Sequence, residues 1–432
     1  MNVLLLGSGG REHAIAWKLS QSSLLDNLYI APGNAGTAQT GTNIQINPLD
    51  FTAIGSFAHE KDIHLVIVGP EEPLVKGIRD YFELNPELEH IALIGPGSAG
   101  AKLEGSKDFA KRFMKKHKIP TARYKSFTAA TLDKGLKYLD TIDAPYVLKA
   151  DGLAAGKGVL ILDDLNEAKK ELQQILTQSR FGVAGDTIVI ENFLDGIEMS
   201  VFILTDGINY KILPEAKDYK RIGVGDTGLN TGGMGAVSPV CFADEHFLKK
   251  VENRIIKPTI SGLQSENIQF NGFIFFGLMN VKGDPFMIEY NVRLGDPEAE
   301  VIIPRIKNDL LQSLIALSEN HLNNVEWSFD SNAAATIMLV SGGYPGHYEK
   351  GNHICGLNNI HDSIVFHAGT KKDENGNLLT NGGRVIALTT LMPTIEKALD
   401  KSYHNAELIQ FESKYYRTDI GADLISIDQI RN

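Results

Sequence analysis

Residues 3–10, "VLLLGSGG", form an apolar run that ends in a glycine-rich turn, and a helical pattern follows it. The same pattern returns in three later segments: "LYIAPGNAG" (28–36), "LVIVGPEEP" (65–73) and "IALIGPGSAG" (91–100). Strands that alternate with helices predict a parallel, doubly wound sheet that binds ligands at the carboxyl ends of its strands. We therefore expect all four turns to lie along one edge of an N-terminal sheet.

Composition excludes several classes of protein. The chain has 432 residues, more than one domain usually contains, and its net charge of -11 argues against a nucleic-acid partner. No apolar run approaches the roughly 18 residues that cross a bilayer, and Met1 leads into a short strand pattern rather than a signal peptide. The two cysteines, Cys241 and Cys355, are too few for a disulfide scaffold. We expect a cytoplasmic monomer or homodimer that binds small molecules and neither nucleic acid nor membrane.

The rest of the chain divides into further units. A basic helix pattern after Gly105 ends at Ile119-Pro120, which indicates a boundary near 105 to 120. Strand patterns around the helical stretch "LNEAKKELQQILTQS" predict a small α+β unit at about 121–192. Further strands at "AAATIMLVS" and "GRVIALTT" predict a small β-rich C-terminal domain, with "DENGN" (373–377) at a hairpin tip. The predicted fold class is therefore a multidomain α/β and α+β protein, with domains at 1–104, 105–325 and 326–432.

The segment "KADGLAAGKGV" (149–159) contains three glycines and two lysines, which is typical of a backbone that approaches a phosphate closely. It is not a P-loop, because Gly152 and Gly156 bracket only three residues and Lys157 is followed by Gly158. Its position between two strand patterns predicts a hairpin that folds over a triphosphate as a flap, with Lys149 and Lys157 facing the phosphates. A mobile hairpin with solvated lysines fits this segment equally well when it is considered alone.

The segment "IEYNVRLGDPE" (288–298) favours the functional interpretation. Alternate residues of a strand share a face, so Glu289, Asn291 and Arg293 project together. A carboxylate beside an amide oxygen suits Mg²⁺, and the arginine offers a fork for a carboxylate or a phosphate. The alternative is the solvent face of an edge strand, which the apolar neighbour "FIFFGLMNV" makes the weaker interpretation.

The segment "GSGGREH" (7–13) begins like a dinucleotide-binding turn but has Glu12 where the third glycine would stand. The second strand also ends without the acidic residue that holds an adenosine ribose. We expect a phosphate at this helix start and no NAD site, with a turn that serves only packing as the alternative. The 12 histidines form no metal-binding pattern, and neither cysteine has an evident base partner.

Taken together, these motifs resemble the phosphoribosylamine–glycine ligases (glycinamide ribonucleotide synthetases), a family of ATP-grasp enzymes. The matching segments follow the family order over nearly the whole chain: "GSGGREHA", "PGNAGTA", "GPEEPLVKG", "LEGSK", "KADGLAAGKGV", "LNTGGMGAVSP", "RLGDPEAE", "GYPG" and "NGGRV". One departure is clear. Where the family usually reads Gln-Asp-His-Lys-Arg, this chain has Lys217-Asp218-Tyr219-Lys220-Arg221, so no role of that Gln or His carries over.

The resemblance implies a reaction of purine biosynthesis that uses ATP as cosubstrate and Mg²⁺ or Mn²⁺ as cofactor. Glycine and 5-phosphoribosylamine are ligated through a glycyl phosphate, which yields glycinamide ribonucleotide, ADP and phosphate. The N-terminal domain would bind the ribose phosphate, and the central ATP-grasp domain, with its flap at about 121–192, would bind ATP.

The resemblance also assigns roles to individual residues. The implied catalytic residues are Arg293, Lys149 and Asp218, and the metal ligands are Glu289 and Asn291. The implied ATP-binding residues are Lys107, Lys149, Gly152, Gly156, Lys157, Gly158, the hinge residues Glu191, Asn192, Phe193 and Leu194, and Glu198 on the ribose. The implied substrate-binding residues are Gly9, Gly10, Asn34, Glu72, Lys220, Arg293, Gly295 and Asp296.

Three other functions remain open at this point. A different ATP-grasp ligase or a formylating enzyme would share the ATP-binding residues and differ in the N-terminal domain. A nucleotide-dependent oxidoreductase would need the acidic residue that the second strand lacks. A nucleotide sensor would bind ATP without releasing phosphate.

Overall fold

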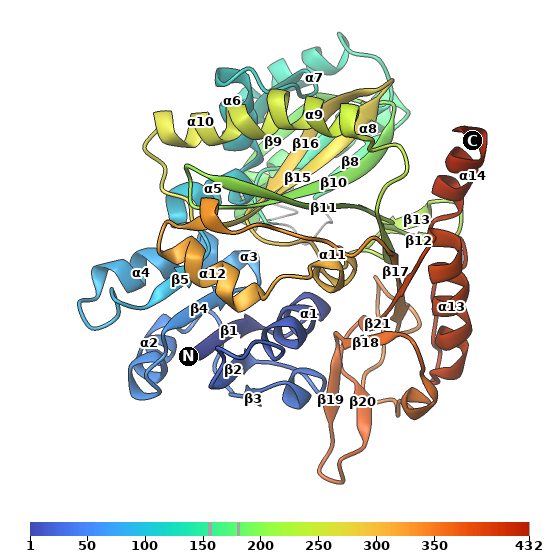
Figure 1. Cartoon of the computed structure of the whole chain (residues 1–432). Coiled ribbons are helices and arrows are strands. Elements are labelled where there is room, and N and C mark those ends of the chain that lie inside the picture. The colour runs from blue at the N-terminus through green and yellow to red at the C-terminus, as the bar shows by residue number, and fades with distance from the viewer. Residues whose placement is uncertain (154–157, 179–181, 432) are drawn as a thin grey trace.

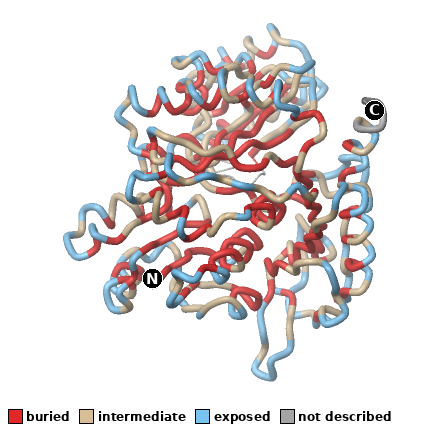
Figure 2. The backbone as a smooth tube through the Cα atoms, viewed as in Figure 1, coloured by how far each residue is buried: buried red, intermediate tan, exposed pale blue. Residues whose placement is uncertain are grey.

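The computed structural model describes residues 1–153, 158–178 and 182–431, which fold into three main sheets with helices packed around them (Figure 1). In the part of the chain described, no helix is both long and apolar enough to cross a membrane. Figure 2 shows that buried residues follow the strands and the inner helices, whereas exposed residues gather on the outer loops.

The N-terminal residues form a five-stranded parallel sheet in the order β3-β2-β1-β4-β5. Its strands are β1 (Asn2–Gly7), β2 (Asn27–Pro32), β3 (Thr42–Asn43), β4 (Leu65–Val68) and β5 (Ala92–Ile94). The helical segments between and after them are α1 (Gly10–Leu19), η1 (Thr37–Gln39), α2 (Phe51–Glu60), α3 (Glu71–Val75), α4 (Ile78–Leu84) and α5 (Ser98–Gly105). The central strand β1 is almost wholly apolar because strands flank both its edges and packed elements cover both its faces. The parallel order confirms the predicted sheet, and it places the four turns on one edge.

A second, four-stranded antiparallel sheet follows in the order β6-β9-β7-β8. Its strands are β6 (Tyr124–Thr128), β7 (Tyr146–Ala150), β8 (Val159–Leu162) and β9 (Thr187–Asn192), and its helical segments are η2 (Ala129–Thr131), α7 (Leu132–Leu139), α8 (Leu165–Gln178) and η3 (Gly182–Gly185). Leu148, Leu172 and Ile190 belong to a core that is separate from the main core of the molecule. β7 and β8 pair as the hairpin expected around residues 149–159, of which residues 154–157 lie outside the described ranges.

The largest sheet has eight antiparallel strands in the order β16-β15-β10-β11-β14-β17-β21-β18. These strands are β10 (Ile197–Thr205), β11 (Tyr210–Asp218), β14 (Gly235–Ser238), β15 (Gly272–Val281), β16 (Asp284–Asn291), β17 (Ala333–Val340), β18 (Ile364–His367) and β21 (Arg384–Met392). Because β14 pairs with β17, the sheet continues past residue 326 without a break. The C-terminal strands are thus hydrogen-bonded directly to the strands that carry the central motifs.

Helices cover this sheet and fill the space between it and the N-terminal domain (Figure 1). The helical segments of this part of the chain are α6 (Lys107–Lys116), α9 (Glu245–Val251), the π-helical turn η4 (Glu252–Ile256), α10 (Lys257–Ser265), α11 (Ala299–Arg305), α12 (Leu310–Ser318), α13 (Ile395–Leu408) and α14 (Ala422–Arg431), with short 3₁₀ turns η5 (Leu322–Asn324) and η6 (Leu357–Asn359). α11 contacts α1 on one side and β11 and β17 on the other, so it joins the N-terminal domain to the large sheet.

Two short ribbons complete the fold among the described residues. One pairs β12 (Arg221–Gly223) with β13 (Thr227–Asn230), and the other pairs β19 (Thr370–Lys372) with β20 (Leu378–Thr380). Asp373 Oδ1 accepts hydrogen bonds from the backbone N–H groups of Asn375 and Asn377. The segment 373–377 is therefore the tip of a hairpin, as the sequence predicted.

Candidate active site

Glu289 lies among lysines from three other parts of the chain. Burial by itself would raise the pKa of its carboxyl group, yet the positive charges of Lys220, Lys149 and Lys107 lower that pKa below its usual range. Arg293 adds a smaller effect of the same sign. The tertiary structure thus brings together an ionised carboxylate and cations that are separated by up to about 180 residues in the sequence.

Arg293 and Asn291 extend this cluster at the end of β16. Arg293 Nη2 lies 2.8 Å from Glu104 Oε1, and its Nε lies 3.3 Å from Glu71 Oε2. The orientation that satisfies the Asn291 amide lets its Nδ2 donate to Glu104 Oε1 at 3.0 Å and to the Tyr290 carbonyl at 3.1 Å. In this orientation the amide nitrogen of Asn291, rather than its oxygen, faces Glu104.

Lys149 and Lys111 share one buried carboxylate. Their Nζ atoms lie 3.2 and 3.0 Å from Glu191 Oε2. Burial lowers the pKa of Lys111 to about 8, although Glu191 works in the opposite direction. Lys107, at the start of α6, donates from Nζ to the Gly152 carbonyl at 3.0 Å, so α6 contacts the beginning of the predicted flap.

Asp218 and Lys220 lie where β11 ends. Lys220 forms an ion pair with Glu198, and the charges of Glu198 and Asp218 raise the pKa of Lys220 well above its usual range in spite of burial. Burial raises the pKa of Asp218, and Lys220 opposes that shift. The segment thus places a buried carboxyl group and a cation next to Glu289, whose charge acts on both of them.

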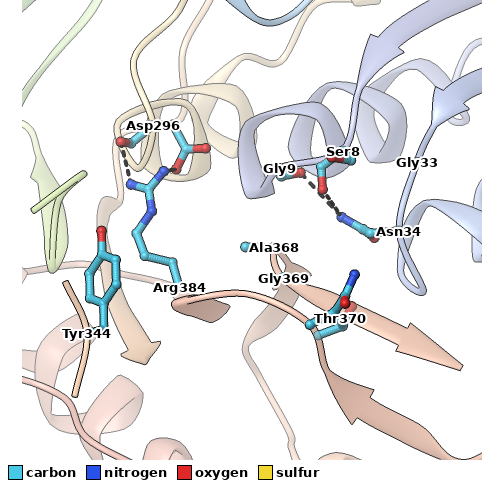
Figure 3. A pocket seen from close by; sticks show the side chains of 11 residues that line it. Ser8, Gly9, Gly33, Asn34, Asp296, Tyr344, Ala368, Gly369, Thr370 and Arg384 are labelled. Atoms are coloured by element: carbon cyan, nitrogen blue, oxygen red, sulfur yellow. Dashed lines mark hydrogen bonds and ion pairs between the residues drawn. The ribbon is translucent and has the colours of Figure 1, made fainter. Parts of the chain in front are cut away.

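A cavity of about 290 Å³ opens where all three predicted domains meet (Figure 3). Its lining residues are Ser8, Gly9, Gly33, Asn34, Asp296, Tyr344, Ala368, Gly369, Thr370, Asn381 and Arg384. Arg384 Nη2 lies 3.0 Å from Asp296 Oδ1, and its Nη1 donates to the carbonyl groups of Asp296 at 2.8 Å and Gly232 at 2.5 Å. Asp296 follows Arg293 by three residues, so one short turn connects this cavity to the charged cluster.

Asn34 joins the N-terminal turns to the C-terminal domain at this cavity. Its Nδ2 donates to the carbonyl groups of Ser8 at 2.8 Å and His367 at 2.7 Å, while its Oδ1 accepts from the backbone N–H groups of Gly36 and Thr37. His367 is held a second time, because its backbone N–H donates to His13 Nδ1 at 2.7 Å. Asn34 and His13 therefore fix the segment that leads to Ala368, Gly369 and Thr370.

The start of α1 is already occupied by a side chain of the protein. Glu12 Oε2 accepts from the Gly9 backbone N–H at 2.6 Å, and Glu12 Oε1 pairs with Arg11 Nε at 2.6 Å. A Cβ atom at Gly7 or Gly69 would meet the Glu12 side chain at 2.5 or 2.1 Å. The Gly9 amide is therefore taken by the Glu12 carboxylate, and the phosphate expected at this helix start stays a prediction.

Three domain models of one family match the chain in order. They are the phosphoribosylglycinamide synthetase N domain over residues 1–104, the ATP-grasp (A) domain over residues 105–299 and the C domain over residues 334–423. The chain belongs to the phosphoribosylglycinamide synthetase family.

Curated relatives match this chain over nearly its full length. The phosphoribosylamine–glycine ligase of Fusobacterium nucleatum is 44% identical over 427 residues, which are 98% of this chain and 98% of that protein. A bifunctional purine biosynthetic protein of Pichia angusta is 44% identical over 97% of this chain, which spans 53% of that longer protein. The crystal structure of the Thermotoga maritima phosphoribosylamine–glycine ligase matches with a TM-score of 0.83 at 36% identity, over 97% of this chain and 100% of that one.

A more distant structure shares only the fold. The biotin carboxylase domain of Hydrogenobacter thermophilus 2-oxoglutarate carboxylase matches with a TM-score of 0.73 at 18% identity, over 99% of this chain and 93% of that one. Together, the comparisons confirm the ATP-grasp fold and the family that the sequence motifs predicted.

The residues expected at the site fall into several groups. Those associated with the charged cluster are Lys107, Lys149, Glu191, Glu198, Asp218, Lys220, Glu289, Asn291 and Arg293. Those that line the cavity are Gly9, Asn34 and Asp296. Asn192 is the last residue of β9, and Phe193 and Leu194 lie between β9 and β10. Gly152 and Gly158 lie on either side of residues 154–157, which are outside the described ranges. Gly156 and Lys157 lie outside the described residues.

Three further residues expected to bind substrate are closely packed or exposed. Gly10 packs against α11, where a Cβ atom would lie 2.2 Å from Glu300 Oε1. A Cβ atom at Gly295 would lie 2.3 Å from Glu298 Oε2. Glu72 is exposed, whereas its neighbour Glu71 contacts Arg293. Close packing therefore explains why glycine stands at both positions. Their roles as substrate ligands stay predictions.

Several residues of the site were missed by sequence reasoning. They are Glu71, Glu104, Lys111, Tyr344, Thr370 and Arg384. Arg384 lies in "NGGRV" and Tyr344 in "GYPG", two segments that matched the family pattern without suggesting a role. Lys111 and Glu104 belong to helices whose charged residues resemble ordinary surface positions, and only their burial distinguishes them.

Proposed function

We propose that the chain ligates glycine to 5-phosphoribosylamine with ATP and releases glycinamide ribonucleotide, ADP and phosphate. The observation that carries this proposal is the convergence of Lys107, Lys149 and Lys220 on Glu289. Such a cluster suits a triphosphate and its metal ion, because cations neutralise the phosphates and the carboxylate holds the metal. The names of the full-length relatives supply the two other substrates.

The chemistry requires an activated carboxylate. The γ-phosphoryl group of ATP would pass to a carboxylate oxygen of glycine, which leaves ADP and a glycyl phosphate. The amine of phosphoribosylamine would then attack the carbonyl carbon, lose a proton and expel phosphate. No side-chain nucleophile is needed, so the residues would act by orienting the substrates and by neutralising charge.

Individual roles follow from the position of each side chain. Lys107 and Lys149 would contact the phosphates, and Glu198 would lie toward the ribose of ATP. Lys220, which is paired with Glu198, would contact a substrate. Arg293 would orient the glycine carboxylate, because its guanidinium group is held by Glu71 and Glu104 at the end of β16. A group with a fixed orientation loses little freedom when the substrate binds.

Glu289 and Asn291 suit a divalent cation. Glu289 is kept ionised by the surrounding cations, and the amide nitrogen of Asn291, rather than its oxygen, faces Glu104. Among the described residues there is no group of three or more His, Cys, Asp or Glu side chains that could hold a metal. A Mg²⁺ or Mn²⁺ ion would therefore take its other ligands from phosphate oxygens and water, and it would neutralise charge on the transferred phosphoryl group.

The cavity at the junction of the domains would bind phosphoribosylamine. The guanidinium group of Arg384 and the polar side chains of Thr370 and Asn381 line it, which suits a sugar phosphate. Its connection to Arg293 through the turn at Asp296 would bring the amine close to the activated glycine. The activation of glycine by ATP and the attack by the amine would thus take place at neighbouring sites, which one short turn connects.

The test is an assay of ADP release in which glycine and freshly generated phosphoribosylamine are each omitted in turn. We expect sustained ADP release only when both are present. Release that continues with another amine or another carboxylate would identify a different ATP-grasp ligase. ATP binding without any phosphate release would identify a nucleotide sensor.

We also assign the enzyme to the cytoplasm, as a monomer or homodimer. In support, the chain has only two cysteines, Cys241 and Cys355, as is typical of proteins from a reducing compartment. Fractionation of the source cells would test the compartment, and sedimentation of the purified protein would test the oligomeric state.

A further inference from the structure

The end of β11 presents two sets of side chains in alternation. Asp218 and Lys220 face the charged cluster, where they interact with Glu198 and Glu289. Lys217 and Tyr219 contact the C-terminal segment of the chain instead. Because alternate residues of an extended chain point to opposite sides, a contact made by one set restrains the backbone that carries the other.

Asp423, in the first turn of α14, holds both Lys217 and Tyr219. Its Oδ2 lies 3.1 Å from Lys217 Nζ, and its Oδ1 accepts a hydrogen bond from the Tyr219 hydroxyl at 2.6 Å. Lys217 Nζ also lies 3.7 Å from the centre of the Tyr219 ring. Lys217 and Tyr219 are both buried, so this three-residue contact is shielded from water on the side of the sheet.

The residues just before α14 hold the chain immediately after Lys220. Arg417 is 1% exposed, and it pairs with Asp419 at 2.7 Å and with Asp226 at 2.6 Å. Its Nη1 also donates to the Arg221 carbonyl at 3.1 Å. Asp419 Oδ2 in turn accepts from the Gly225 backbone N–H at 2.8 Å.

One more hydrogen bond attaches the same hairpin. The Tyr415 hydroxyl donates to the Ile222 carbonyl at 2.9 Å. The C-terminal segment 415–423 thus contacts the chain at 217–226 both before and after Lys220, and Asp218 and Lys220 lie between the points of attachment.

We propose that Asp423 is a positioning residue for ligation, which holds Lys217 and Tyr219 so that Asp218 and Lys220 keep their places beside Glu198 and Glu289. The inference rests on the proposed roles of Asp218 and Lys220. Lys217 and Tyr219 are also the two positions at which this chain departs from the Gln and His of the family pattern. The ion pair of Lys217 and the hydrogen bond of Tyr219 to Asp423 are therefore made by side chains that differ from the family pattern.

The experiment compares Asp423→Ala, which removes both contacts, with Tyr219→Phe, which removes only the hydroxyl group. Glu396→Ala is the matched control, because Glu396 is an exposed acid in the first turn of another helix of the same domain, α13. The kcat and the KM for each substrate are measured at 25 °C on protein whose circular dichroism spectrum matches that of the wild type. The side chain of Asp423 is 43% exposed, so its truncation should leave the chain folded.

We expect Asp423→Ala to lower kcat at least fivefold, with a KM for ATP within twofold of wild type. Tyr219→Phe should lower kcat by a smaller factor, and the double variant should be no worse than Asp423→Ala alone, because both changes break the same connection. Glu396→Ala should keep kcat within twofold. A kcat of Asp423→Ala within twofold of wild type, even with a lower melting temperature, would overturn the inference and leave α14 a merely stabilising element.

Asp218→Asn separates this inference from the proposed function. If Asp218→Asn lowers kcat at least tenfold and Asp423→Ala does not lower it, the role of Asp218 stands and the positioning role of Asp423 fails. If Asp218→Asn leaves kcat unchanged, the role assigned to Asp218 fails and the inference fails with it. Loss of kcat in both variants, with an unchanged control, supports both assignments.

Discussion

Lowering the pH from 7.5 to 5 should lower the free energy of unfolding, because at pH 5 His13 takes up a proton only when the junction between α1 and β18 unfolds. The residue is 5% exposed, and its Nδ1 accepts a hydrogen bond from the His367 backbone N–H at 2.7 Å. A protonated imidazole carries a hydrogen on both nitrogens and cannot accept this bond. Burial, with a contribution from the charge of His367, lowers the pKa of His13 to about 3.

The size of the effect follows from the difference in pKa between the folded and unfolded states. An unfolded histidine has a pKa of about 6.5, so below that pH the unfolded chain binds a proton that the folded chain refuses. The stabilisation linked to His13 is therefore complete above pH 6.5 and is lost as the pH falls toward 3. Between pH 7.5 and 5 the loss amounts to about 2 kcal/mol of the free energy of unfolding.

Urea unfolding of the wild type and of His13→Asn, at pH 7.5 and at pH 5, measures this loss. The side-chain oxygen of asparagine can accept the same backbone hydrogen bond and does not titrate, while His367 is present in both proteins and its titration cancels. The wild type should be the more stable protein at pH 7.5, and its advantage should shrink by about 2 kcal/mol at pH 5. An advantage that changes by less than about 0.5 kcal/mol would refute the reasoning.

Three further substitutions test the site and its packing. Glu289→Gln should lower kcat/KM more than about tenfold, which is a loss of about 1.4 kcal/mol of transition-state stabilisation, with an unchanged circular dichroism spectrum. A smaller loss would contradict the metal assignment. Arg384→Met should raise the KM for phosphoribosylamine more than about tenfold and that for ATP less than about threefold, and equal increases in steady-state assays would contradict separate sites. Gly10→Ala should lower the free energy of unfolding in urea by about 1–3 kcal/mol, because the added methyl group meets Glu300, and Glu300→Ala in the same chain should restore part of the loss. Additive losses in that double variant would show that the two residues do not compete for space.

The elements of the fold could be predicted because their signals are local. Each apolar run that ends in a glycine-rich turn marks a strand and its exit, and the repeated alternation with helices requires parallel strands. The hairpin around residues 149–159 and the tip at 373–377 followed from turn residues between strand patterns. The continuity of the sheet through β14 and β17 was not foreseen, because pairing between strands separated by about a hundred residues leaves no local pattern.

The site was predicted less completely than the fold. Alternation along β16 placed Glu289, Asn291 and Arg293 on one face, since the period of a strand is independent of its surroundings. The partner of Arg293 depended on how α3 packs: Glu71 makes the contact, whereas the neighbouring Glu72, which was expected to bind substrate, is exposed. Which of two adjacent glutamates faces Arg293 depends on how the helix is rotated against its neighbours. The sequence does not show this rotation, because the two residues are identical.

For this protein, the sequence by itself determined the order of strands and turns, the family motifs and the side chains that share a face of β16. Only the tertiary structure decided that Glu12 fills the start of α1, that Arg384 reaches the turn at Asp296, and that the C-terminal segment attaches to β11 through Asp423. The physical reason is that sequence patterns report interactions between residues close together in the chain, and a site depends on contacts between distant ones. Local periodicity states where a side chain points relative to its own element, whereas a binding site forms where elements from distant parts of the chain pack together and exclude water from the charges they share.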